Sequence, residues 1–147
     1  MNDKEKNDVY YVCVLIEYIG RVTKNTRKEI ANKLGTEGIE YIYNLADVYH
    51  CLTFEEVSDE IIEKYDIKQG NFDNVAECKY EVPTFMAIGK VYRRLVEDIE
   101  SDGNIVQAIF SVFKSFISDK ISNFNASTFY SSREYLLESY KAGYLLD

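Results

Sequence analysis

The chain has little of what interrupts or cross-links a polypeptide. It contains one proline, Pro83, no tryptophan, one histidine, His50, and three cysteines. A single proline removes the strongest helix breaker, so long helices are expected. The three cysteines are widely spaced and form no CxxC pair, so they do not predict a disulfide framework. Reduced thiols are typical of the cytosol, and we therefore expect a cytoplasmic protein.

Long apolar runs are also missing. No run approaches the roughly 20 residues that a bilayer-spanning helix needs, and the charged start MNDKEKND is followed by no signal-peptide pattern. The formal net charge is −8, from 25 acidic and 17 basic residues. This excess argues against non-specific binding to nucleic acids and to anionic membrane surfaces. A chain of 147 residues with 46% hydrophobic content can bury one core without disulfides or metals.

Catalytic and cofactor motifs are missing from the sequence. It has no GxSxG elbow, no GxGxxG loop and no GxxxxGK[ST] loop. His50 and Cys51 are adjacent, but adjacent residues on a helix do not face each other, and a zinc site needs about four ligands. We therefore predict no catalytic residues, no metal site and no cofactor. A small enzyme that uses His50 and Cys51 remains the least favoured alternative.

Helical periodicity is the dominant pattern that is present. Apolar residues recur at three- and four-residue steps, and S/T-x-x-E capping boxes begin several of these stretches. They predict helices over residues 8–22, 26–35, 39–46, 53–65, 84–99, 105–124 and 131–142. The boxes are Thr26/Glu29, Thr53/Glu56 and Ser131/Glu134. The fold class is therefore all-α, a compact bundle of about six to seven helices in a single domain.

Two further expectations concern the second half of the chain. Residues 67–83 are irregular, so we place a linker there without expecting it to separate two domains, and CKYEVP suggests a short extended piece. A turn is expected at residues 101–103. The helix over residues 105–124 is apolar on more than one side, so Phe113, Phe116 and Ile117 should be buried.

A short basic run stands out in this acidic chain. Arg21, Lys24, Arg27 and Lys28 lie where the first helix ends and the second begins. We predict that a nucleic acid or an acidic partner would bind at these four residues. Tyrosines suit protein interfaces because a large ring carries a polar tip. The chain has thirteen, and Tyr41 and Tyr43 complete the predicted binding residues, with Tyr135 and Tyr140 as a further place to look.

The same region resembles a helix-turn-helix. TRKEIANKLG has the inward residues and glycine of a first helix, which predicts a helical hairpin near the N-terminus. The second half is one position out of register, and its recognition helix carries Glu37, Glu40 and Asp47 with no base. Acids there would repel phosphates. A DNA-binding regulator is therefore an alternative that we do not favour.

The residue patterns also carry a family resemblance. The segments YYVCVLIEYIG, TRKEIANKLGTEGIEYIYNLADVYH and FEEVSDEIIEKY resemble a small bacterial helical family of unknown function. The segments GNFDNVAECKYEVPTFMAIGKVYRRLV and SFISDKISNFNASTFYSS resemble the extension of its longer members. Members of this kind are encoded beside proteins resembling ADP-ribosyltransferase toxins. The resemblance implies an antitoxin-like or accessory partner, and it carries over no catalytic residue.

The leading hypothesis is a non-enzymatic helical protein-interaction module, an antitoxin-like partner of a neighbouring gene's product. An acidic protein associates quickly with a basic partner through electrostatic steering. Homo-oligomerisation is left open by the sequence.

Overall fold

The computed structural model describes residues 1–100 and 103–147, and all regular secondary structure in those ranges is helical, with no strand. The helices are α1 (Asp3–Thr23), α2 (Arg27–Tyr49), α3 (Phe54–Lys64), α4 (Phe85–Ile99), α5 (Ile105–Lys114), α6 (Phe116–Ile121) and α7 (Arg133–Ala142), with a 3₁₀ turn η1 (Thr128–Tyr130) before α7. The all-α prediction is confirmed. None of the helices in the described ranges has the length and apolar character needed to cross a bilayer.

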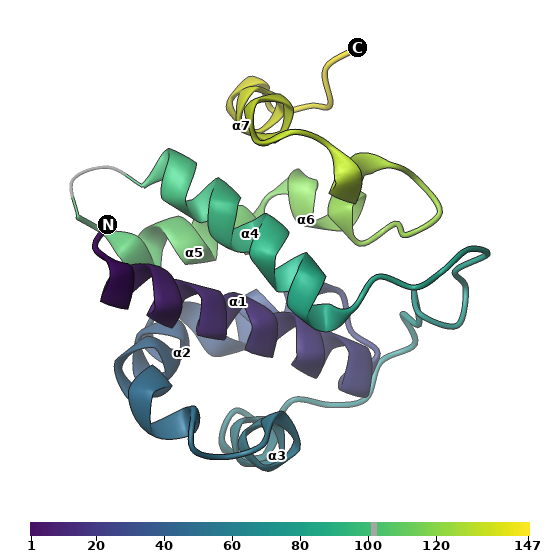
Figure 1. Ribbon diagram of the computed structural model, residues 1–147. Coiled ribbons are helices and arrows are strands. Elements are labelled where there is room, and N and C mark those ends of the chain that lie inside the picture. The colour runs from purple at the N-terminus through teal and green to yellow at the C-terminus, as the bar shows by residue number, and fades with distance from the viewer. Residues whose placement is uncertain (101–102) are drawn as a thin grey trace.

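Helix α1 is the centre of the bundle. It packs against α4 on one side and α2 on the other, and α3 and α7 lie at opposite ends of the molecule (Figure 1). Its residues from Val9 to Ile19 are mostly buried, and the single hydrophobic core takes residues from both sides of the irregular segment 67–83. The apolar stripe on α1 is wide because helices cover it on more than one side.

The chain begins its first helix earlier than the periodicity predicts. Asn2 accepts a hydrogen bond from the Glu5 backbone nitrogen, and the Glu5 carboxylate accepts one from the Asn2 nitrogen. This capping box starts α1 at Asp3 instead of residue 8. The predicted boxes at Thr26/Glu29 and Thr53/Glu56 are present.

The predicted break at Gly35 takes the form of a kink. Gly35 has φ 65° and ψ 179°, and it alone departs from helical geometry between Arg27 and Tyr49. Positive φ is accessible to glycine without a steric cost. A helix-turn-helix joins its helices by a turn of about three to four residues, so the expected hairpin is here one kinked helix.

The long helix predicted over residues 105–124 is wrong in one respect: it is divided into α5 and α6 at Ser115. Ser115 is extended, with ψ 167°; its hydroxyl donates to the Val112 carbonyl and accepts from the Ile117 nitrogen. A serine that satisfies backbone groups at a helix junction competes with the continuous ladder. Phe113 and Ile117 are buried as predicted. Phe116, directly after the break, is only partly buried.

Two smaller expectations are corrected. The cap of α7 is Ser132, which accepts from the Tyr135 nitrogen, so the predicted Ser131/Glu134 box is one residue out of register. The CKYEVP segment bends at Lys79 and Tyr80 and is otherwise irregular, with no strand. The turn predicted at residues 101–103 falls partly outside the described residues, although Gly103 has φ 74°.

Candidate functional site

The structure divides the predicted basic run between the interior and the surface. Arg27 is fully buried. Its Nε and one Nη lie 2.8 and 2.9 Å from the two carboxylate oxygens of the buried Glu17. The expectation that Arg27 belongs to an exposed basic surface is therefore wrong, because its charge is already neutralised inside the core.

Two further donors of Arg27 are also used. They bond the Asn25 carbonyl at 2.9 Å and the Asn74 side-chain oxygen at 3.2 Å, and the Asn74 amide in turn donates to the Ser122 carbonyl at 2.9 Å. We call Glu17, Arg27 and Asn74 the buried ionic centre. Burial alone would lower the pKa of Arg27, but the hydrogen bonds and charge of Glu17 raise it above its usual value. A buried charge pair is tolerated because these bonds replace lost water.

Gly20 makes room for this centre. A Cβ at Gly20 would lie 2.5 Å from the Arg27 Cδ and 2.6 Å from its Nε. The Arg27 side chain cannot move aside because its guanidinium is bonded to three different residues. The glycine in the otherwise helical sequence EYIGRV is thus required by a close approach between α1 and α2.

The other basic residues are partly occupied. Arg21 pairs with Glu17 at 2.7 Å and donates to the Pro83 carbonyl, and Lys28 lies 3.6 Å from Asp119. Lys24 is exposed and ends α1 in a left-handed conformation, with φ 56°. Within the described residues, therefore, Lys24 is the one member of the four that makes no ion pair.

The predicted tyrosines lie on different faces of α2. Tyr41 contacts α3, where the Lys64 ammonium is 4.5 Å from its ring centroid. Tyr43 lines a polar hollow with Glu5, Glu40 and Asn104. The structure does not gather Tyr41 and Tyr43 into one surface, because residues two apart on a helix point in different directions.

His50 and Cys51 are both exposed at the end of α2. The His50 ring packs 5.1 Å from the Tyr11 ring, whereas Cys13 is buried and Cys78 lies elsewhere, beside the Tyr80 carbonyl. No group of three metal-ligating side chains occurs among the residues that the structure describes. The acids of α3 (Glu55, Glu56, Asp59, Glu60 and Glu63) are exposed, as expected of a solvated helix face.

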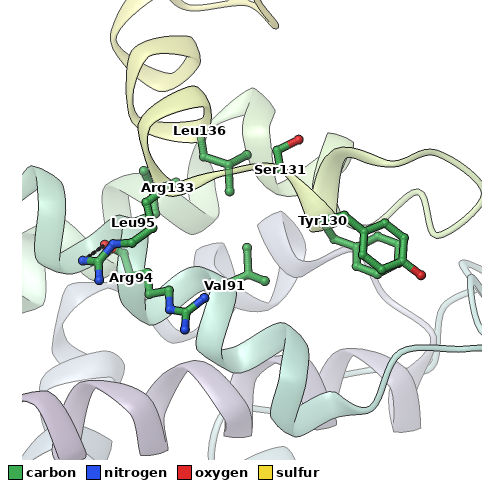
Figure 2. Close-up of a pocket in the computed structure, with 8 residues that line it drawn as sticks. Val91, Arg94, Leu95, Tyr130, Ser131, Arg133 and Leu136 are labelled. Carbon is green, nitrogen blue, oxygen red and sulfur yellow. Dashed lines mark hydrogen bonds between the residues drawn. The ribbon is translucent and has the colours of Figure 1, made fainter.

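An open groove lined by both apolar and polar residues lies instead between α4 and the η1–α7 segment. It has two adjoining parts, of about 230 and 310 Å³, which share Val91, Phe129 and Tyr130. Its floor is one face of α4 and its wall comes from η1 and the start of α7; the full lining adds Glu81, Val82, Pro83, Thr84, Ala87, Ile88, Arg94, Leu95, Ser131, Arg133 and Leu136. Figure 2 shows α4 and the η1–α7 wall facing each other across the first part. We call this surface the α4–α7 groove.

Helical spacing explains the floor of the groove. Ala87, Val91, Arg94 and Leu95 recur at four- and three-residue steps, so they share one face of α4. Leu95 is buried, while Val91 is half-buried and Ala87 is exposed. The periodicity of this helix identifies its apolar face, but only the packed structure shows that α7 leaves one edge of it uncovered.

The wall of the groove is fixed by two sets of contacts. Arg133 at the start of α7 bonds Asp98 at 2.7 Å and Glu97 at 3.2 Å, which anchors α7 to the end of α4. The Tyr130 ring packs 4.0 Å from the ring of the buried Phe129. Tyr130 is nevertheless 74% exposed. It therefore lies at the edge of the groove, where one face of its ring contacts Phe129 and the rest is accessible to solvent.

Comparisons with known proteins found no matching family model, no matching curated protein and no matching solved structure. The family resemblance suggested by the sequence therefore stays a prediction.

Proposed function

We propose that this protein is a non-enzymatic interaction module that binds a protein partner in the α4–α7 groove, as an antitoxin-like or accessory protein would. The observation that carries the proposal is the groove itself, with its apolar floor, its exposed tyrosine and its arginine. Tyrosine, phenylalanine and arginine are enriched at protein interfaces, and anchoring side chains of a partner insert into such hollows.

The groove suits a protein partner better than an enclosed small molecule. Ligand pockets usually bury most of the surface of a small molecule, whereas both parts of this groove are open along one side to solvent. The net charge of −8 supports fast association with a basic partner. Within the described residues, the basic run no longer offers a comparable surface, because Arg27 is buried and Arg21 and Lys28 are paired.

The test is co-expression with the products of the neighbouring genes, followed by size-exclusion chromatography of the purified complex. The exposed Ala87 on the groove floor is replaced in Ala87→Glu, which places a bulky charge on the apolar surface. Tyr144→Ala is the matched control, because it removes another exposed aromatic side chain from outside the groove lining.

We expect Ala87→Glu to abolish the complex and Tyr144→Ala to retain it. A complex that survives Ala87→Glu but is lost in Lys24→Glu would move the site to the end of α1. A complex lost in neither variant would contradict the proposal for the groove.

A further inference from the structure

The arginines of this chain are almost all committed to carboxylates. Arg21 and Arg27 pair with Glu17, Arg93 lies 3.4 Å from Glu97, and Arg133 pairs with Glu97 and Asp98. Among the described residues, Arg94 is the one arginine of five without an ion pair. The two acids of α4, Glu97 and Asp98, pair with Arg93 and Arg133 instead.

Arg94 lies in the α4–α7 groove. It lines the first part together with Val91, Leu95 and Leu136, and only its backbone carbonyl is used by a neighbour, as an acceptor for Arg133. In Figure 2 the Arg94 and Arg133 guanidinium groups point in different directions, and the Arg94 group lies on the Val91 side. The five N–H donors of Arg94 are thus available next to an apolar hollow.

This combination defines the chemistry of an occupant. An unpaired guanidinium recognises a carboxylate through two parallel hydrogen bonds, and apolar walls beside it strengthen that interaction by excluding water. Glu81 lies at the other end of the groove, near Pro83. Its negative charge would repel an acidic side chain of the partner at that end. The groove therefore has a positive end and a negative end joined by an apolar floor.

We infer that the α4–α7 groove binds a segment of a protein partner in which an acidic side chain stands beside an apolar anchor residue. The apolar residue occupies the hollow between α4 and Phe129, and the acid pairs with Arg94. This inference rests on the proposed function of the groove and adds a specificity-determining residue to it.

The experiment selects short random peptides displayed on phage against the full chain and, in parallel, against Arg94→Gln, Arg94→Glu and Tyr130→Ala. Peptides selected by the unaltered chain should be enriched in an acid next to a leucine or an aromatic residue. The synthesised peptides should bind Arg94→Gln about tenfold more weakly, because glutamine carries no charge and can keep only one of the two hydrogen bonds. Arg94→Glu should select basic peptides instead, and Tyr130→Ala should weaken all of them.

The outcomes separate the inference from the proposed function. Peptides that depend on Tyr130 but contain no enriched acid, or that bind Arg94→Gln unchanged, overturn the inference and leave the groove as a binding surface. Failure to select any peptide that depends on Tyr130 overturns both the inference about Arg94 and the proposed function of the groove. Light scattering that shows self-association lost in Ala87→Glu identifies a second copy as the occupant and also overturns the inference. Thermal melting of each variant confirms that it is folded.

Discussion

Arg27 at the start of α2 and Arg94 in the middle of α4 are the same residue type in opposite surroundings. Arg27 is fully buried and bonded to Glu17, Asn25 and Asn74. Arg94 is partly exposed beside an apolar groove and has no carboxylate partner among the described residues. The first arginine holds α1, α2 and the segment before α4 together, whereas the second is available to another molecule. Sequence position and charge alone do not distinguish these two roles.

The first prediction concerns Arg27, the buried arginine. Arg27→Met should lower the free energy of unfolding by about 3 kcal/mol, because it leaves the buried Glu17 carboxylate with fewer partners. Arg21 still pairs with Glu17, which keeps the loss at the lower end of the usual range. Urea denaturation followed by circular dichroism measures it.

Two controls sharpen this result. Lys24→Met removes an exposed base from the same run and should change stability by less than about 0.5 kcal/mol. The double variant Glu17→Leu with Arg27→Met should be more stable than Arg27→Met alone, since it removes the fully buried Glu17 carboxylate, whereas Arg21, which loses its pair, is partly exposed. Equal stability of Arg27→Met and Lys24→Met would show that the buried ionic centre does not hold the fold.

The second prediction concerns Gly20, which leaves room for the Arg27 side chain in the buried ionic centre. Gly20→Ala should cost about 1–3 kcal/mol, because the added methyl group meets the Arg27 side chain and overpacks the junction of α1 and α2. Val22→Ala, at an exposed position on the same helix, is the control. In the Arg27→Met background the cost of Gly20→Ala should fall, and a double-mutant cycle measures this coupling. Additive effects would contradict the close contact.

The third prediction concerns Arg94, the partly exposed arginine. Arg94→Gln should change the free energy of unfolding by less than about 0.5 kcal/mol, because no ion pair of the described chain is lost. Arg133→Gln should cost more, since it removes the bonds that join α7 to Glu97 and Asp98. Thermal melting of the two variants under the same conditions makes the comparison. A larger loss for Arg94→Gln would indicate a structural role and weaken the case for recognition.

The fourth prediction uses the thiols, which report burial without altering stability. Burial raises the pKa of the Cys13 thiol, and the side chain is inaccessible, so it should not react with a thiol reagent in the native state. Cys51 is exposed and should be labelled first. Mass spectrometry of the labelled peptides identifies the site, and Cys51→Ser provides the control. Rapid native labelling of Cys13 would mean that α1 separates from its neighbours.

The sequence predicted a helix well where the residues that start it lie within one turn of each other. The boxes at Thr26 and Thr53 begin helices because a hydroxyl and a carboxylate three positions apart satisfy free amide groups, whatever the rest of the chain does. The division at Ser115 was missed because an apolar run reads as one helix, whereas the serine hydroxyl stabilises a junction between two. The α4–α7 groove was missed because the periodicity of α4 shows an apolar face but not which part of it another helix covers.

The sequence by itself determined that this protein is helical, where most helices begin and end, and that its surface carries a net negative charge. Those properties depend on spacing, on caps within one turn and on composition. Only the tertiary structure decided which charges are buried, because Glu17, Arg27 and Asn74 lie on three separate segments that packing brings together. It also decided that α7 leaves a groove on α4 with Arg94 at one end, because exposure depends on the neighbours that fold against a helix and not on the helix alone.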